Sequence, residues 1–229
     1  MGRNFVDIWY GHMRLASDAM QKFSPILNDE ERQKAETFKV PLMRDRFTAV
    51  RGMLRLTLAD YLNVSPANLQ FEVGEYGKPR LICDSLHFNL SHTADHLLIA
   101  VGNFPNLGID IEKLNQRSNL DAIAKRIFSG QELNRWRQLS ADRQLLGFYR
   151  LWTKKEAFVK AVGRGIALGM ELCEFDLEEG GQLNAIPAEY GLASDWQVTE
   201  LVVPCGLSAA LVTQRCNFKI MQREITLGE

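Results

Sequence analysis

Along the chain, stretches in which apolar and polar residues alternate are separated by stretches in which apolar residues recur every three or four positions. Alternation places one set of side chains on each face of a strand, whereas the longer spacing gives a helix one apolar side. The alternating pattern predicts strands over residues 6–10, 69–73, 81–82, 87–92, 97–101, 108–112, 174–177, 196–203, 207–213 and 218–224. The helical pattern predicts helices over residues 30–36, 42–62, 120–127, 130–139 and 142–162.

Several predicted helices carry boundary residues of the expected kind. Asn28 or Asp29 can cap the first of them, and Pro41 is expected to end or kink that segment. Ser129, with a glutamate three residues later, matches a capping box. The glycines at 163 and 165 stop the longest helix, as glycine does at helix C-termini.

The chain divides most naturally at the Pro-containing connector of residues 103–107. This gives two expected units, residues 1–105 and residues 106–229, each with helices and strands. A length of 229 residues suits one large domain or two small ones, and 46% hydrophobic with 24% charged residues is ordinary for a globular protein.

Charge and composition exclude several classes of protein. A net charge of -1 without a basic stripe argues against a nucleic-acid or membrane-surface partner. No apolar run is long enough to span a membrane, and the start of the chain lacks a secretory pattern. The four cysteines form no C-x-x-C or zinc spacing, so we expect small buried thiols in a reducing, cytoplasmic compartment.

The stretch Gly108–Glu112 holds the first candidate chemistry. In a strand, Ile109 and Ile111 face a core, while Asp110 and Glu112 share the other face. Two carboxylates about 4 Å apart repel by roughly 4 kcal/mol at an effective dielectric constant near 20. A divalent cation would offset this repulsion, and hard oxygen ligands favour Mg²⁺. The alternative is an edge strand with both acids pointing into solvent.

Glu156 and Lys160 lie four residues apart on the longest predicted helix, and therefore share a face. They could form an ordinary exposed ion pair. Alternatively, Glu156 is a third metal carboxylate and Lys160 is a phosphate ligand one turn away.

Ser91 and His92 follow one another at the end of a predicted strand. Neighbours on a strand point to opposite faces, and no G-x-S-x-G occurs, so a nucleophilic Ser-His pair is disfavoured. Binding of a phosphate is easier to reconcile with this pair, although a capped turn with a surface histidine fits equally well.

Basic residues upstream have two interpretations. Lys78 occupies a Gly-Lys-Pro turn, where a lysine is usually solvated. Four arginines in the helix over 42–62 are by default a solvated face, but they could form a guanidinium set for phosphate: Arg44, Arg46, Arg51 and Arg55. No phosphate-binding glycine loop of the common nucleotide folds is present.

These signals follow one another in a specific order. The chain carries, in sequence, Gly77-Lys78-Pro79, Phe88-Asn89-Leu90-Ser91-His92, Gly108-Ile109-Asp110-Ile111-Glu112, and Trp152-x-x-Lys155-Glu156-Ala157-Phe158-x-Lys160 before Gly163 and Gly165. The ordered set resembles the motif series of the 4′-phosphopantetheinyl transferases, and is most similar to the large class typified by the surfactin-synthetase activating enzyme. The resemblance spans about residues 30 to 170, and the ordered set is far more specific than any single motif.

The resemblance implies transfer of the phosphopantetheine arm of coenzyme A to a serine of an apo acyl or peptidyl carrier protein, with Mg²⁺ and release of adenosine 3′,5′-bisphosphate. The carriers of such enzymes serve fatty-acid, polyketide or peptide synthesis. Motif by motif, it implies that Asp110, Glu112 and Glu156 hold the metal and that Lys160 contacts the phosphates. It also implies that coenzyme A is bound by Ser91, His92, Lys78, Arg51, Arg46 and Lys34. Glu31 departs from the family pattern, because some relatives have lysine there.

Two expectations about architecture and one about chemistry follow from this resemblance. The fold is expected to be α+β, a pseudo-dimer of two similar halves with the active site between them, and the protein is expected to be a monomer. Glu156, directly or through a water that it orients, is our hypothesis for the base that takes the serine proton. Two rival functions use the same residues: a metal-dependent phosphohydrolase or nuclease, and a non-catalytic binder of coenzyme A or carrier protein.

Overall fold

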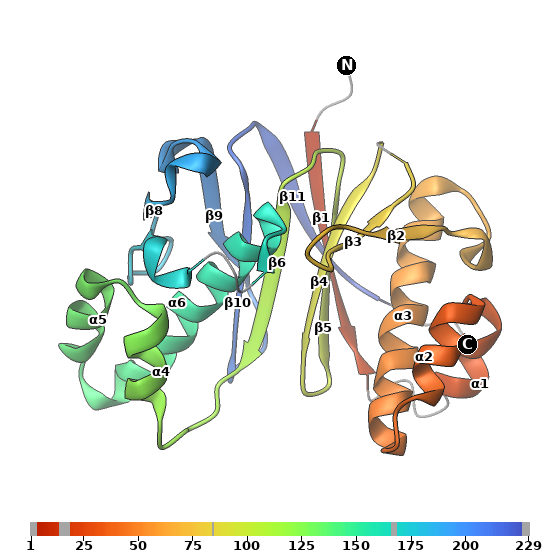
Figure 1. Ribbon diagram of the computed structural model, residues 1–229, viewed down its shortest axis with the longest axis horizontal. Helices are drawn as coiled ribbons and strands as arrows, with labels where there is room; N and C mark the ends of the chain where they lie inside the picture. Colours follow the sequence, from red (N-terminus) through yellow and green to blue (C-terminus); the bar gives the residue numbers. More distant parts are fainter. Residues whose placement is uncertain (1–3, 14–18, 84, 166–168, 226–229) are drawn as a thin grey trace.

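The chain has an α+β fold in a computed structural model that describes residues 4–13, 19–83, 85–165 and 169–225 (Figure 1). The strands are β1 (Asn4–His12), β2 (Phe71–Val73), β3 (Pro79–Leu81), β4 (His87–Thr93), β5 (His96–Gly102), β6 (Leu107–Lys113), β7 (Glu174–Phe175), β8 (Leu183–Ala185), β9 (Trp196–Glu200), β10 (Leu207–Gln214) and β11 (Phe218–Glu224). The helices are α1 (Ala19–Phe23), α2 (Asp29–Glu36), α3 (Pro41–Leu62), α4 (Leu120–Ile127), α5 (Gly130–Arg137) and α6 (Ala141–Val162).

Local signals in the sequence position the helix ends. All five helices predicted from the apolar period are present, with boundaries within two residues of the expected ones. Asn28 and Ser129 each form a capping box with a glutamate three residues later, and Pro41 occupies the first turn of α3. Gly163 ends α6 in the left-handed conformation, with a φ of 73°.

Two larger sheets form the centre of the molecule. The first has the order β11-β1-β5-β4 and is mixed, because β11 runs parallel to β1 while the other pairs are antiparallel. The second, β6-β10-β9, is antiparallel. The pairing of β1 with β11 brings the last described strand of the chain into the same sheet as β1, β5 and β4. Two short hairpins, β2-β3 and β7-β8, lie outside these sheets.

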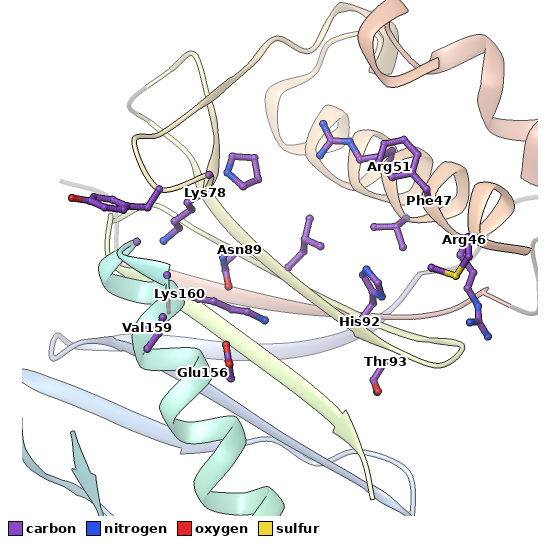
Figure 2. A pocket seen from close by; sticks show the side chains of 18 of the residues that line it. Arg46, Phe47, Arg51, Lys78, Asn89, His92, Thr93, Glu156, Val159 and Lys160 are labelled. Atoms are coloured by element: carbon purple, nitrogen blue, oxygen red, sulfur yellow. The ribbon is translucent and has the colours of Figure 1, made fainter. Parts of the chain in front are cut away.

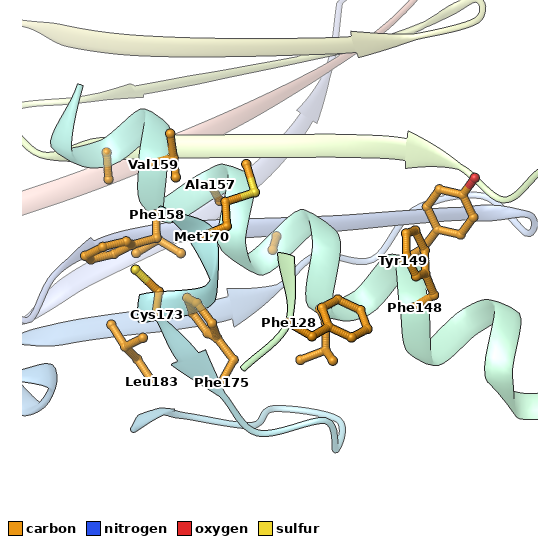
Figure 3. Packing of buried hydrophobic residues seen from close by; sticks show 14 of the residues in the cluster. Phe128, Phe148, Tyr149, Ala157, Phe158, Val159, Met170, Cys173, Phe175 and Leu183 are labelled. Carbon is orange, nitrogen blue, oxygen red and sulfur yellow. The ribbon is translucent and has the colours of Figure 1, made fainter. Parts of the chain in front are cut away.

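The two sheets lie between two groups of helices, with α1–α3 on one side and α4–α6 on the other (Figure 1). One apolar cluster fills the space between α3 and the first sheet, and another packs around α6 (Figure 3). A third cluster joins the sheets to each other and contains Val6, Ile8, Leu98, Ile109 and Ile111. Ile109 and Ile111 are fully buried in it, as the alternating pattern predicts.

The sequence pattern also missed or misjudged some features. The short elements α1 and β8 were not predicted, and β2 begins two residues later than expected. Cys173 is buried as expected for a small apolar side chain, but Cys205 is exposed. Within the described part of the chain, no helix combines the length and the hydropathy needed to cross a membrane.

Candidate active site

A cavity of about 750 Å³ opens between helix α3 and helix α6, with strand β4 along its base (Figure 2). From α3 come Arg46, Phe47 and Arg51; from α6 come Glu156 and Lys160. The Gly77-Lys78-Pro79 turn closes one side, and Asn89, His92 and Thr93 line it from β4. Residues far apart in sequence, and from both expected units, therefore face one space.

Glycine at position 108 brings α6 close to β6. A Cβ atom on Gly108 would overlap the main chain of Ala157 and Ala161, so a larger residue would force the helix away. The small residues on α6 face this contact, which places Glu156 and Lys160 above the acidic face of β6. The glycine of the Gly108–Glu112 stretch is thus required for close packing of helix on strand.

Asp110 is buried, with 3% of its surface exposed, and lies beneath the cavity wall. Its Oδ1 accepts hydrogen bonds from the Ser91 hydroxyl and the Lys160 ammonium, both at 2.7 Å. Lys160 also donates to Ser91 Oγ at 2.8 Å. The interpretation of this strand as an exposed edge with solvated acids is therefore wrong for Asp110. Lys160 makes its ion pair with Asp110, so a simple exposed pair with Glu156 is not what forms.

Burial and mutual repulsion raise the pKa values of the other two acids. For Glu112, burial is the largest cause and the charge of Asp110 adds to it, while hydrogen bonds from Thr93 and Trp152 offset part of the rise. For Glu156, burial again comes first, followed by the charge of Asp110. The three carboxylates are therefore close enough to influence one another, with one lysine among them.

The donor set suits a hard divalent cation, although the three carboxylates do not converge on one point. Asp110 Oδ2 is buried and has no hydrogen-bond partner among the described residues, which leaves one carboxylate oxygen available to a ligand. Carboxylate oxygens are the ligands that Mg²⁺ prefers. Across the described residues, however, no three His, Cys, Asp or Glu side chains approach closely enough to form a ready-made metal site.

His92 and Ser91 point to opposite sides of β4, as neighbours on a strand should. Ser91 is buried against Asp110, whereas His92 lines the cavity. Loss of solvent lowers the pKa of His92, and the positive charges of Lys160 and Arg46 lower it further. Because the two side chains point to opposite sides of β4, Ser91 cannot pass a proton directly to His92.

Lys78 belongs to the cavity wall and is not simply solvated. Its Nζ donates to the carbonyl oxygens of Leu107 at 2.9 Å and Ala161 at 3.3 Å, which joins the turn to β6 and α6. Burial lowers its pKa to about 8. Its charge is therefore sensitive to pH in the neutral to mildly alkaline range.

Three of the four arginines of α3 divide into two groups, whereas Arg44 does not line the cavity. Arg55 is fully buried, pairs with Glu31 at 2.7 Å and donates to two main-chain carbonyls, so the default expectation of a solvated side chain is wrong for it. Arg51 also pairs with Glu31 but lines the cavity. Arg46 lines the cavity and pairs with Asp95 at 2.9 Å.

Lys34 lies apart from the other expected coenzyme ligands. It is exposed on α2 and does not line the cavity, although its Nζ lies 5.9 Å from the ring centre of Phe38, which does. Sequence reasoning gave no role to Asn89, Thr93 or Trp152, which contact the acidic strand or its carboxylates. The signal for Asn89 was present, because Asn89 alternates with Ser91 on the predicted strand, whereas Thr93 lies one residue beyond the predicted end of that strand.

Comparison with known proteins gives a consistent result. Residues 106–212 match the 4′-phosphopantetheinyl transferase superfamily. The 4′-phosphopantetheinyl transferase HetI of Nostoc sp. is 36% identical over 201 residues, which cover 86% of this chain and 82% of that protein. A 4′-phosphopantetheinyl transferase of Bacillus subtilis is 32% identical over 171 residues, or 74% of this chain and 75% of the relative.

A third relative is the 4′-phosphopantetheinyl transferase Sfp of Bacillus subtilis (strain 168), which is 30% identical over 171 residues, covering 74% of this chain and 75% of that protein. The family expected from the ordered motifs is thereby confirmed. With relatives that match along most of their length and an acidic cluster beside a large cavity, the chain belongs to the 4′-phosphopantetheinyl transferases of the Sfp type and is an enzyme of that family.

Proposed function

We propose that the chain transfers the phosphopantetheine arm of coenzyme A to a serine of an apo acyl or peptidyl carrier protein, in a Mg²⁺-dependent reaction. The single observation that carries the proposal is the cluster of Asp110, Glu112, Glu156 and Lys160 beside a cavity of about 750 Å³ with cations on its walls. Three acids with one lysine leave negative charge that a metal ion would balance, and the surrounding cations suit a substrate with several phosphates.

The proposed reaction displaces one phosphate oxygen by another. The carrier serine Oγ attacks the phosphorus that bears the pantetheine arm, a new P–O bond forms, and the bond to the second phosphate breaks. Adenosine 3′,5′-bisphosphate leaves with the electron pair. The serine proton passes to Glu156, directly or through a water that Glu156 orients.

Within this proposal, Asp110, Glu112 and Glu156 would hold Mg²⁺, which supplies charge stabilisation on the phosphate oxygens when bound. The unpaired Asp110 Oδ2 supports this assignment. Lys160 donates a hydrogen bond to Asp110 Oδ1 at 2.7 Å and also lines the cavity. It can therefore contact a phosphate bound in the cavity from its present position.

Coenzyme A would lie along the cavity against residues from both expected units. Lys78, His92, Arg46 and Arg51 line it and supply positive charge or hydrogen-bond donors. Ser91 would act mainly beneath the wall through Asp110 and Lys160. We assign Lys34 the weakest contact, since it reaches the site only through Phe38.

We also propose that residues 1–105 and 106–229 are the two halves of a pseudo-dimer and that the protein acts as a monomer. In support, each half contributes one 22-residue helix, α3 or α6, that packs on antiparallel strands. The cavity that we assign to the substrate lies where the two halves meet.

Incubation of the protein with coenzyme A, Mg²⁺ and an apo carrier protein tests the proposal. We expect the carrier to gain the mass of the phosphopantetheine arm and adenosine 3′,5′-bisphosphate to accumulate in equal amount. Cleavage of coenzyme A without modification of the carrier would instead indicate a phosphohydrolase. Binding without turnover would indicate a non-catalytic binder. Asp110→Asn serves as the inactive control.

A further inference from the structure

Strands β4 and β6 lie side by side but belong to different hydrogen-bonded sheets (Figure 1). Each is the terminal strand of its sheet, so each presents an edge of main-chain groups that need partners. The two strands are also where the halves of the molecule meet. We call the boundary between β4 and β6 the seam. The contacts across the seam therefore determine how the acidic strand β6 is held.

Among the described residues, the hydrogen bonds across the seam come from side chains of β4 rather than from its main chain. Asn89 Oδ1 accepts the N–H of Ile109 at 2.8 Å, and Thr93 Oγ1 accepts the N–H of Lys113 at 3.3 Å. Between them, Ser91 Oγ donates to Asp110 Oδ1 at 2.7 Å. We call Asn89, Ser91 and Thr93 the side-chain ladder.

The ladder also reaches the carboxylates themselves. Thr93 Oγ1 donates to Glu112 Oε2 at 3.2 Å while it accepts from the main chain of the next residue, Lys113. One hydroxyl thereby ties the backbone of β6 and the Glu112 side chain together. Burial of Asn89, at 6% exposed, and of Ser91, at 7%, shields the hydrogen bonds of these two side chains to β6 from competing water.

We propose that the side-chain ladder positions the acidic residues of β6, with Asn89 setting the place of the strand and Thr93 orienting Glu112. A direct main-chain pairing would bring the strands closer and leave no room for side chains between them. The ladder keeps the strands apart and places oxygen atoms next to Asp110 and Glu112. Asn89 and Thr93 are positioning residues, and the consequence for metal binding rests on the function proposed above.

Amide hydrogen exchange of the metal-free protein tests the ladder without reference to any activity. In Thr93→Val, we expect the amide of Lys113 to exchange at least about tenfold faster than in the wild type, while the amide of Ile109 changes little. In Asn89→Ala, we expect the amide of Ile109 to exchange faster than in the wild type, while the amide of Lys113 changes little. If each of the two amides exchanges at the same rate in the wild type and in both variants, the proposed ladder is wrong. If Asn89→Ala does not fold, the exchange of Lys113 in Thr93→Val still tests the ladder.

Binding of Mn²⁺, measured by calorimetry without coenzyme A or carrier, tests the effect on the carboxylates. We expect Thr93→Val to raise the dissociation constant about tenfold, the low end of what loss of such an orienting partner costs. Thr93→Ser keeps the hydroxyl and should restore binding. Thr213→Val is the matched control, since the Thr213 hydroxyl is buried with no hydrogen-bond partner among the described residues.

The outcomes separate this inference from the proposed function. If the wild type binds Mn²⁺ and Thr93→Val binds it equally well, the orienting role of Thr93 is wrong. The same holds if Thr93→Ser or Thr213→Val weakens binding as much as Thr93→Val does. If the wild type binds no Mn²⁺, the metal site of the proposed function fails, whereas the exchange of Lys113 and Ile109 still decides whether the ladder holds β6.

Discussion

Lys155 and Glu156 are neighbours on helix α6, but their side chains enter two different clusters of charge. Lys155 turns into the apolar cluster around α6 and pairs with Glu132 at 2.7 Å, where both side chains are 0% exposed. Its Nζ also donates to the carbonyl oxygens of Met170 and Cys173. Every donor of that ammonium thus has a protein acceptor.

Glu132 is equally well supplied with partners. One of its oxygens accepts the N–H of Phe175 at 2.8 Å, and the other accepts the N–H of Ser129 at 2.6 Å. The pair therefore connects α5, α6 and β7 and leaves no site for a ligand. A buried pair with this complete set of hydrogen bonds belongs to the fold.

The cluster that contains Glu156 has the opposite character. It combines three carboxylates with Lys160 alone, and Asp110 Oδ2 has no partner among the described residues. Adjacent positions of one helix thus supply a satisfied ion pair and an unsatisfied acidic group. The difference teaches that unbalanced charge, rather than buried charge as such, distinguishes the part of α6 that we assign to ligand binding.

The largest expected effect comes from breaking the satisfied pair. Lys155→Met leaves Glu132 charged, buried and without its cation, which should lower the free energy of unfolding by about 3–5 kcal/mol. Urea denaturation followed by circular dichroism measures the change. The double variant with Glu132→Gln should recover part of the loss, because no uncompensated charge remains. A loss below about 1 kcal/mol for Lys155→Met would contradict a structural role for the pair.

Glu156→Gln, one residue further along, should act on turnover and leave stability almost unchanged. We expect kcat for carrier modification to fall about a hundredfold at saturating Mg²⁺, or about 2.7 kcal/mol in activation free energy. The free energy of unfolding should stay within about 1 kcal/mol of the wild type. Asp142→Asn, an exposed acid on the first turn of the same helix, is the control. Near-normal turnover of Glu156→Gln would remove Glu156 from the proposed chemistry.

Sequence patterns were sufficient where the structural cause is local. The period of apolar residues, the capping residues Asn28 and Ser129, and Gly163 depend on neighbours within one or two turns, so the helices could be predicted closely. The short elements α1 and β8 carry too few residues to show a period. The pairing of β1 with β11 joins segments about as far apart as the chain allows, and no local pattern encodes that partner.

The candidate site was predictable as a set of residues but not as an arrangement. Motif order identified Asp110, Glu112, Glu156 and Lys160, while the partners of each acid depend on packing between distant segments. Glu132 was expected only as a helix cap, yet it also neutralises Lys155. Likewise, the burial of Arg55 against Glu31, 24 positions away, could not be inferred from helical spacing on α3 alone.

A smaller effect is expected from the pH dependence of Lys78. Because burial lowers its pKa from 10.5 to about 8, Lys78 loses its charge in the fold well before it would in the unfolded chain. Its contribution to the free energy of unfolding therefore rises between about pH 8 and 10.5, where the unfolded chain binds more protons. The attraction of Lys78 for an anionic ligand, by contrast, falls as pH rises, because the side chain loses its positive charge.

The affinity for coenzyme A should accordingly fall as pH rises through about 8, by up to about tenfold for one charge-assisted contact. Calorimetric titration at pH 7 and pH 9, without metal or carrier, measures this. Lys78→Met should bind more weakly at pH 7 and show much less of the decline. Parallel declines in the wild type and in Lys78→Met would assign the pH dependence to another group.

The smallest effect gives the most direct contrast between the two clusters. Glu112→Gln removes one of three mutually repelling charges, so the metal-free protein should become more stable at pH 7, by less than about 1 kcal/mol because Glu112 is only partly buried. Glu132→Gln removes the partner of buried Lys155 and should lower stability instead. Thermal unfolding of both variants in the presence of a chelator measures the two signs. A loss of stability in Glu112→Gln would show that its bond from Thr93 outweighs the repulsion from Asp110, and the acidic cluster would then resemble the satisfied pair.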